Sequence, residues 1–162
     1  SLRRQRQMCI RDSVRITGRI GAAPTLDFIG KDDHVSDHFG EKLSEAFVCG
    51  VLDKLDLNLP LRFLAPDPTD AGMHYTLFIQ VADPPATRLD ELDEHLSANP
   101  HYRHCRALGQ LLSPRIFVVE GDGFGIYTDT LRNAGQRLGD IKSCALSTRT
   151  DWAKRFAGRY VE

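Results

Sequence analysis

The sequence has no long apolar run, no paired cysteine motif and almost no net charge. No apolar stretch approaches the roughly 20 residues of a membrane span, so we expect no membrane partner. The four cysteines form no C-x-x-C pair, which argues against a zinc ribbon, a thioredoxin-like site or a dense disulfide framework. With 21 basic and 22 acidic residues, nothing favours electrostatic binding to nucleic acid or membranes. We expect a reducing cytoplasm as the compartment.

The first 13 residues, SLRRQRQMCIRDS, differ from the rest of the chain. They hold four arginines and one acid, and they show neither helical nor strand periodicity. They fit a basic arm or an Arg-rich targeting peptide, but the string also resembles the translation of a sequencing-library adapter. We interpret residues 1–13 as a non-native stub, and without its five charges the net charge changes from −1 to −4. Residues 14–162 are then expected to be the tail of a longer protein.

The hydrophobic content, 41% of 162 residues, is enough for the core of one domain. Val14–Thr17 and Thr25–Ile29 alternate and carry β-branched residues, which predicts a hairpin. After a polar loop over 31–40, Ser44 has the features of a helix N-cap, with Glu45 in the first turn. The apolar residues of this helix share one face, as in a helix that lies on a sheet: Phe47, Val48, Val51, Leu52 and Leu55.

Strands and helices alternate in the remainder of the chain. Strands are predicted at Leu61–Ala65 and Met73–Val81, joined by the turn-rich APDPTDAG, and at Arg115–Val119. Trp152, Phe156 and Tyr160 lie four residues apart and predict a terminal helix. The other predicted helices comprise one marked by Leu89, Leu92 and Leu96, one over Tyr102–Leu111, and one over Ile126–Ala134. This order predicts an α+β fold whose mixed or antiparallel sheet is covered by helices.

The histidines and one glycine-rich stretch could suggest a binding site, and each has a plainer structural explanation. Histidines His34 and His38 with neighbouring aspartates, or His101, His104 and Cys105, have ligand-like spacing, but no further cluster completes four ligands, so we predict no metal. The glycines of GDGFG lack the pattern of a phosphate-binding loop and are explained by a strand-to-helix turn. His74, on an apolar strand, is interpreted as a core histidine with a hydrogen-bond partner.

Four stretches in order resemble the acyl-acid amido synthetases of the auxin-responsive Gretchen Hagen family. They are VRITG before an Ala-Pro and an aromatic strand, the loop and helix HVSDHFGEKLSEAFV, the strand HYTLFI, and the run from Gly123-Phe124 to Lys142. Lys42 and Glu45 match the family's lysine and the glutamate three residues later. Two features depart from the plant-type pattern: Ser143-Cys144 replaces a Pro-Arg pair, and the Tyr-Arg-x-Gly-Asp segment before the hinge is absent.

The resemblance implies a small C-terminal lid domain, over 14–162, of a bacterial-type adenylate-forming ligase. It implies a carboxylic acid and an amine as substrates, ATP as cofactor, and Mg²⁺ held mainly by an N-terminal domain outside this sequence. Lys142 is the candidate catalytic residue, whose charge would stabilise the adenylation transition state. The candidate nucleotide- or substrate-binding residues are Lys42, Ser36, Asp37, Glu41 and Glu45.

Plainer alternatives exist for each of these assignments. Lys142 also fits a solvated surface lysine, and the loop residues fit turn, cap and surface roles. The fragment alone is expected to be inactive, because most of both substrate sites is missing. The rival class is a free-standing α+β module that binds a ligand or a partner chain without catalysis. A weaker rival is a nucleic-acid binder that uses the Arg-rich arm.

Overall fold

The computed structural model describes residues 12–31, 35–56, 59–81, 88–137, 139, 141 and 144–161. The chain divides into two compact units, residues 1–34 and residues 35–162, and each is described by itself. The sequence alone predicted no boundary at residue 34. In the described part of the chain, no helix has the length and apolar character that a membrane span requires.

The first unit contains the predicted hairpin. Strands β1 (Asp12–Ile20) and β2 (Ala23–Lys31) pair in antiparallel fashion and are longer than the sequence predicted. The connection is a tight turn in which Gly21 has a φ of 62°, a conformation that glycine adopts without steric cost.

The second unit is built on a four-stranded sheet in the order β5-β6-β7-β8. The strands β5 (Arg62–Thr69) and β6 (Gly72–Ile79) are antiparallel, β7 (Arg115–Val119) runs parallel to β6, and β8 (Gly158–Val161) is antiparallel to β7. The sheet is therefore mixed, which confirms the predicted α+β fold. Two short strands, β3 (Val35–Ser36) and β4 (Leu43–Ser44), pair beside it as a separate ladder.

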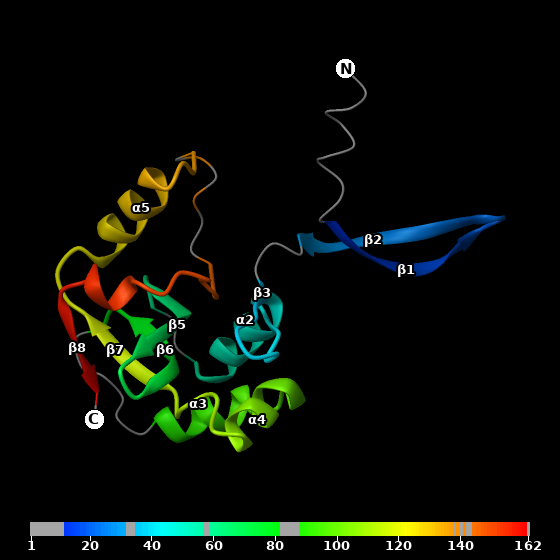
Figure 1. Cartoon of the computed structure of the whole chain (residues 1–162). Coiled ribbons are helices and arrows are strands. Elements are labelled where there is room, and N and C mark those ends of the chain that lie inside the picture. The colour runs from blue at the N-terminus through cyan, green and yellow to red at the C-terminus, as the bar shows by residue number, and fades with distance from the viewer. Residues whose placement is uncertain are drawn as a thin grey trace. The chain divides into compact units, whose positions relative to one another are not determined.

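Helices cover both faces of this sheet, as Figure 1 shows. On one face lie α2 (Glu45–Lys54), α3 (Arg88–Leu96) and α4 (Pro100–Ala107); on the other lie α5 (Gly123–Asn133) and a single 3-10 turn, η2 (Trp152–Lys154). Successive strand residues alternate between two core clusters: Leu77 belongs to the first and Phe78 to the second. The sheet thus forms the middle of three layers.

Helix α2 agrees with its sequence prediction. The Ser44 hydroxyl accepts a hydrogen bond from the amide of Phe47 at 3.3 Å, which caps the first turn. Leu43 and Val48 are fully buried in the same cluster, the positions expected of a hydrophobic staple. These local features place the start of α2 directly after the loop that carries most of the candidate site residues.

The interpretation of APDPTDAG as a turn was wrong. Strand β5 continues through both prolines to Thr69, and the turn is confined to Asp70 and Ala71. The backbone N–H and C=O of Leu64 point away from β6 and form hydrogen bonds with Ala145 and Ser147. Pro66 and Pro68 follow Leu64 at intervals of two, so their backbone nitrogens lie on the same outer side. No hydrogen bond to β6 is lost there, although proline has no N–H. An edge strand therefore accommodates both prolines.

The predicted terminal helix is also wrong. Only Trp152–Lys154 forms one 3-10 turn, and Tyr160 lies in strand β8. Trp152 and Phe156 are buried against Phe63, and the Tyr160 ring packs edge-on against Phe117 at 5.0 Å. Trp152 and Phe156 thus fill the core, whereas Tyr160 belongs to a strand. The last residues form this strand because the edge of β7 is free to pair with β8.

Two helix boundaries differ from the prediction because of their caps. Helix α4 begins at Pro100 rather than Tyr102, because the Asn99 side chain accepts from the amides of His101 and Tyr102 and caps the first turn. Helix α5 begins at Gly123 rather than Ile126, because the Asp122 carboxylate accepts from the amide of Gly125 at 2.9 Å.

Candidate functional site

The candidate loop runs over 37–42 and is closed at its base by the pairing of β3 with β4. Val35 pairs with Ser44 and Ser36 with Leu43, so both ends of the loop are held together. Within the loop, the exposed Asp37 accepts a hydrogen bond from the amide of Gly40 at 2.8 Å. The loop is thus held in shape by hydrogen bonds between its own residues.

The Glu41 side chain lies inside this loop and is 0% exposed. Its carboxylate accepts hydrogen bonds from the amides of His38 and Phe39, at 2.9 and 2.8 Å, and from the Tyr75 hydroxyl at 2.6 Å. The Tyr75 hydroxyl has one proton, which it donates to Glu41. The Ser36 hydroxyl is 1% exposed and lies 2.6 Å from the Tyr75 oxygen, to which it can donate its own proton. We call this set of five residues the Glu41 clamp.

The Glu41 clamp favours the ionised carboxylate. Burial would raise the pKa of Glu41, but the hydrogen bonds from Tyr75, Phe39 and His38 outweigh it and hold the pKa below its ordinary value. Burial, and then the bond to Glu41, raise the pKa of Tyr75, so the phenol stays protonated and available as a donor. A charged carboxylate that is buried and supplied with donors is a stable arrangement for organising a loop.

Lys42 lies next to the Glu41 clamp and is exposed, while Glu41 and Leu43 on either side are fully buried. Its φ is 44°, in the left-handed region that lysine rarely occupies. Its carbonyl oxygen accepts a hydrogen bond from the Asn99 side chain at 3.4 Å. The backbone of Lys42 is therefore held from both sides, and its side chain extends from a fixed base.

Glu45 connects the loop to a distant part of the chain. It belongs to the first turn of α2, and its carboxylate accepts a hydrogen bond from the amide of Ala145 at 3.2 Å. Leu64 donates to the Ala145 carbonyl and accepts from the Ser147 amide, both at 2.8 Å, so this segment adds a short parallel bridge to the edge of β5. The Tyr127 hydroxyl lies 2.9 Å from the sulfur of Cys144.

Four residues, Cys144–Ser147, are therefore anchored from α2, β5 and α5. Lys142, the predicted catalytic residue, precedes this anchored segment by two residues in the sequence and itself lies outside the described residues. The hydrogen bond between the Glu45 carboxylate and the Ala145 amide joins the first turn of α2, which follows the candidate loop, to the segment after Lys142. This contact was not predicted from the sequence.

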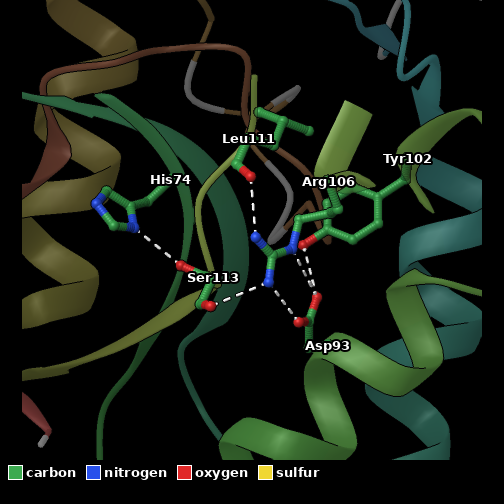
Figure 2. A network of polar contacts seen from close by, with 6 residues as sticks. All are labelled: His74, Asp93, Tyr102, Arg106, Leu111 and Ser113. Carbon is green, nitrogen blue, oxygen red and sulfur yellow. Dashed lines mark hydrogen bonds and ion pairs between the residues drawn. The ribbon is translucent and has the colours of Figure 1, made fainter. Parts of the chain in front are cut away.

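A polar network lies between helices α3 and α4, as Figure 2 shows. The Arg106 guanidinium binds the Asp93 carboxylate in a two-point contact at 3.2 and 2.8 Å and donates to the Leu111 carbonyl and the Ser113 hydroxyl. The Tyr102 hydroxyl donates to Asp93 at 3.1 Å. This network joins α3, α4 and the segment that leads into β7.

Two side-chain contacts connect α4 to the loop and to the Glu41 clamp. The Tyr102 ring packs edge-on against the Tyr75 ring of the Glu41 clamp at 6.2 Å, and the Cys105 thiol lies 3.4 Å from the Phe39 carbonyl oxygen. His74 has a hydrogen-bond partner, as predicted, since its Nδ1 lies 2.8 Å from the Ser113 carbonyl oxygen, although the side chain is only partly buried.

The predicted site residues thus fall into distinct environments. Lys42 and Asp37 are exposed, Ser36 and Glu41 are buried within the Glu41 clamp, and Glu45 is half-buried. Three residues that contact the loop were not predicted from the sequence: Tyr75, Asn99 and Cys105. Tyr75 belongs to the HYTLFI motif, which is the only signal in the sequence that points to it. Among the described residues, no group of three or more His, Cys, Asp or Glu side chains is placed to hold a metal ion.

The fold and the loop define the class of protein: a small α+β domain with a mixed sheet, helices on both faces and a lysine-bearing loop ahead of α2. A family model described as the GH3 family C-terminal domain matches residues 51–151. The chain belongs to the GH3 family, whose C-terminal domain it contains, which confirms the family resemblance found in the sequence.

Solved structures have the same fold. One, titled GH3.15 acyl acid amido synthetase, superposes with a TM-score of 0.66 at 21% identity over 91% of this chain. Another, AtGH3.15 acyl acid amido synthetase in complex with 2,4-DB, gives 0.67 at 20% identity over 90% of this chain. The chain spans 30% and 29% of the length of these two proteins. No curated protein sequence matches.

Proposed function

We propose that this chain is the C-terminal domain of an ATP-dependent acyl-acid amido synthetase, which activates a carboxylic acid and joins it to an amine such as an amino acid. The observation that carries the proposal is the family match over residues 51–151. The similarity of fold to proteins titled as acyl acid amido synthetases supports it. We place the enzyme in a bacterial cytoplasm, in keeping with its separated cysteines.

The proposed reaction has two steps. The carboxylate attacks the α-phosphate of ATP and releases pyrophosphate, which forms an acyl adenylate; the amine then attacks the acyl carbon and displaces AMP. Two anions meet in the first step, so a cation that reaches the α-phosphate would stabilise the transition state more than the ground state. We propose that the Mg²⁺ that accompanies ATP is held mainly by the rest of the enzyme.

Lys142 is the proposed cation for adenylation. Its support in this chain is its place in the sequence two positions before the segment Cys144–Ser147, which hydrogen bonds to Glu45 and Leu64 hold in place. The chemistry requires a positive charge at the α-phosphate, which a lysine ammonium of this domain would supply.

The loop residues are proposed to act at the nucleotide and substrate side of the same domain. Lys42 and Asp37 are exposed and suited to direct contact with ribose or the incoming amine. Ser36 and Glu41 act from behind, because their side chains are buried and hydrogen-bonded within the protein. Glu45 connects this loop to the segment after Lys142.

The test begins with recovery of the coding sequence upstream of the Val14 codon and expression of the complete reading frame. We expect carboxylate-dependent ATP–pyrophosphate exchange from the complete protein and none from Val14–Glu162 alone. Exchange by the fragment would contradict the predicted division of the sites, and a start codon close to Val14 would favour a binding module without catalysis.

Substitution of Lys142 tests the assigned role in the complete protein. Lys142→Ala should slow adenylation by about two to three orders of magnitude while it changes the Kd for ATP much less, because the ammonium acts in the transition state. Lys154→Ala, which removes an exposed lysine elsewhere on the domain, is the matched control. Equal losses in adenylation and in ATP binding would argue against the role.

A further inference from the structure

The strained backbone of Lys42 needs a cause outside the residue itself. Only one other non-glycine residue in the described chain has a positive φ, Asp56 at 49°, in the turn after α2. Aspartate tolerates this conformation because its short side chain bonds to the local backbone, whereas lysine has no such local compensation. The conformation of Lys42 is therefore imposed by its surroundings.

The strongest contacts around Lys42 converge on one group, the Glu41 carboxylate. It receives the amides of two residues that precede it in the loop and a hydroxyl from strand β6, all within 2.9 Å, while it is fully buried. Residues 38 and 39 can approach it only if the chain turns back between Asp37 and Glu41, and the chain then re-enters β4 through Lys42. The contacts of Glu41 thus hold the chain just before Lys42, and the pairing of β4 with β3 holds it just after.

We propose that Glu41 is a positioning residue, whose buried carboxylate holds the loop in the one conformation that presents Lys42 from a fixed, left-handed base. The partner of Lys42 rests on the proposed function, in which its exposed side chain contacts the ribose of the nucleotide or the incoming amine. The clamp itself does not depend on that assignment. Strain at Lys42 is offset by the three hydrogen bonds to Glu41, so the lysine backbone is organised before the ligand arrives.

The carboxylate is the part of the clamp that neutral groups cannot replace. Its Oε1 accepts from His38 and Tyr75, and its Oε2 accepts from Phe39, so both oxygens act as acceptors. A glutamine at this position has one amide oxygen and one NH₂ group, and the NH₂ would face a donor. Glu41→Gln therefore keeps the size of the side chain and breaks the pattern of acceptors.

The experiment uses the 162-residue chain and measures the backbone of Lys42 directly. In Glu41→Gln, the three-bond coupling between the amide and Hα protons of Lys42 should leave its left-handed value, and hydrogen exchange at the amides of His38 and Phe39 should rise. The rest of the spectrum should keep its folded dispersion. Glu94→Gln, an exposed glutamate on α3, is the matched control and should change none of these readings.

A double-mutant cycle then asks whether Glu41 maintains the strain at Lys42. With Glu41 present, Lys42→Gly should have a folding equilibrium constant about threefold to fivefold above that of Lys42→Ala, because glycine relieves the strain. In the Glu41→Gln background the ratio should fall to about one. If Glu41→Gln does not fold, Glu41→Asp, which keeps the charge but retracts it, takes its place in both measurements.

Two results would overturn the proposal. One is an unchanged coupling at Lys42 when Glu41 is replaced and the chain remains folded. The other is the same ratio between the glycine and alanine variants in both backgrounds. Neither measurement uses activity, so a failure of the proposed synthetase function would leave both unaffected and the two failures are distinguishable.

Discussion

At the scale of single residues, the candidate loop is organised by polar groups that are buried. Glu41 and Ser36 have the polar character expected of binding residues, yet both are turned inward and satisfied by Tyr75. Lys42, in contrast, is exposed between two buried neighbours. Polar residues in a loop therefore divide into those that shape it and those that it presents.

Loss of the Tyr75 hydroxyl should be costly. Tyr75→Phe is expected to lower the free energy of unfolding by about 2 kcal/mol, because the buried Glu41 carboxylate loses a donor and the Ser36 hydroxyl loses a partner. Urea titration followed by the fluorescence of Trp152, the one tryptophan and 1% exposed, measures it.

Tyr160→Phe is the matched comparison for this measurement. The Tyr160 hydroxyl also donates to a carboxylate, Asp67, at 2.7 Å, but Tyr160 is only partly buried and Asp67 keeps a second donor from Thr76. The loss should stay below about 1 kcal/mol. If both variants lose the same free energy of unfolding, the burial of the Glu41 clamp does not increase the contribution of the Tyr75 hydroxyl to stability.

At the scale of elements, the edge strand β5 shows how neighbours override local signals. Pro66 and Pro68 look like turn residues, but the strand they occupy is bonded to β6 through the residues between them. The segment Cys144–Ser147 covers part of the outer edge at Leu64. The same edge thereby accepts prolines and anchors the residues that follow Lys142.

Proline at neighbouring positions of β5 should have opposite consequences. Ala65→Pro removes an amide on the side of β6 from a fully buried position and should cost at least about 3 kcal/mol. Pro66→Ala restores an amide on the outer side and should change stability by less than about 1 kcal/mol. Thermal unfolding of both variants measures the difference, and a severe loss in Pro66→Ala would contradict the assigned direction of the strand.

At the scale of the whole molecule, the chain contains one core-bearing unit and one hairpin. Both core clusters lie within residues 35–162, and the family match falls in the same unit. The hairpin leaves Ile16, Ile20 and Leu26 more than half exposed. Because every member of the two core clusters belongs to the second unit, we expect this unit to keep its stability without the hairpin.

Removal of the first unit tests this division. The fragment Val35–Glu162 should unfold within about 2 °C of the complete chain, because no member of either core cluster is lost. Near-ultraviolet circular dichroism during heating reports the packing of Trp152 and its aromatic neighbours. A midpoint lower by many degrees would mean that the hairpin contributes to the core of the second unit.

Prediction from the sequence succeeded where the signal is local. The cap at Ser44, the apolar face of α2 and the β-rich strands on either side of the Asp70 turn depend on residues a few positions apart, and the structure agrees with them. It failed at the aromatic residues of the C-terminus and the prolines of β5, because their conformation depends on which strand edge is free. Spacing alone contains no information on sheet order.

The sequence by itself determined the family, the α+β class and the position of the candidate lysine loop, because motifs and periodicities are properties of neighbouring residues. Only the tertiary structure decided which side chains of that loop face inward. The bond from Tyr75 to Glu41 crosses 34 positions and the bond from Ala145 to Glu45 crosses 100. Such contacts form only when the sheet brings distant segments together. They bury the Glu41 carboxylate, a group that is usually exposed in a polar loop, and give it hydrogen-bond donors within the protein.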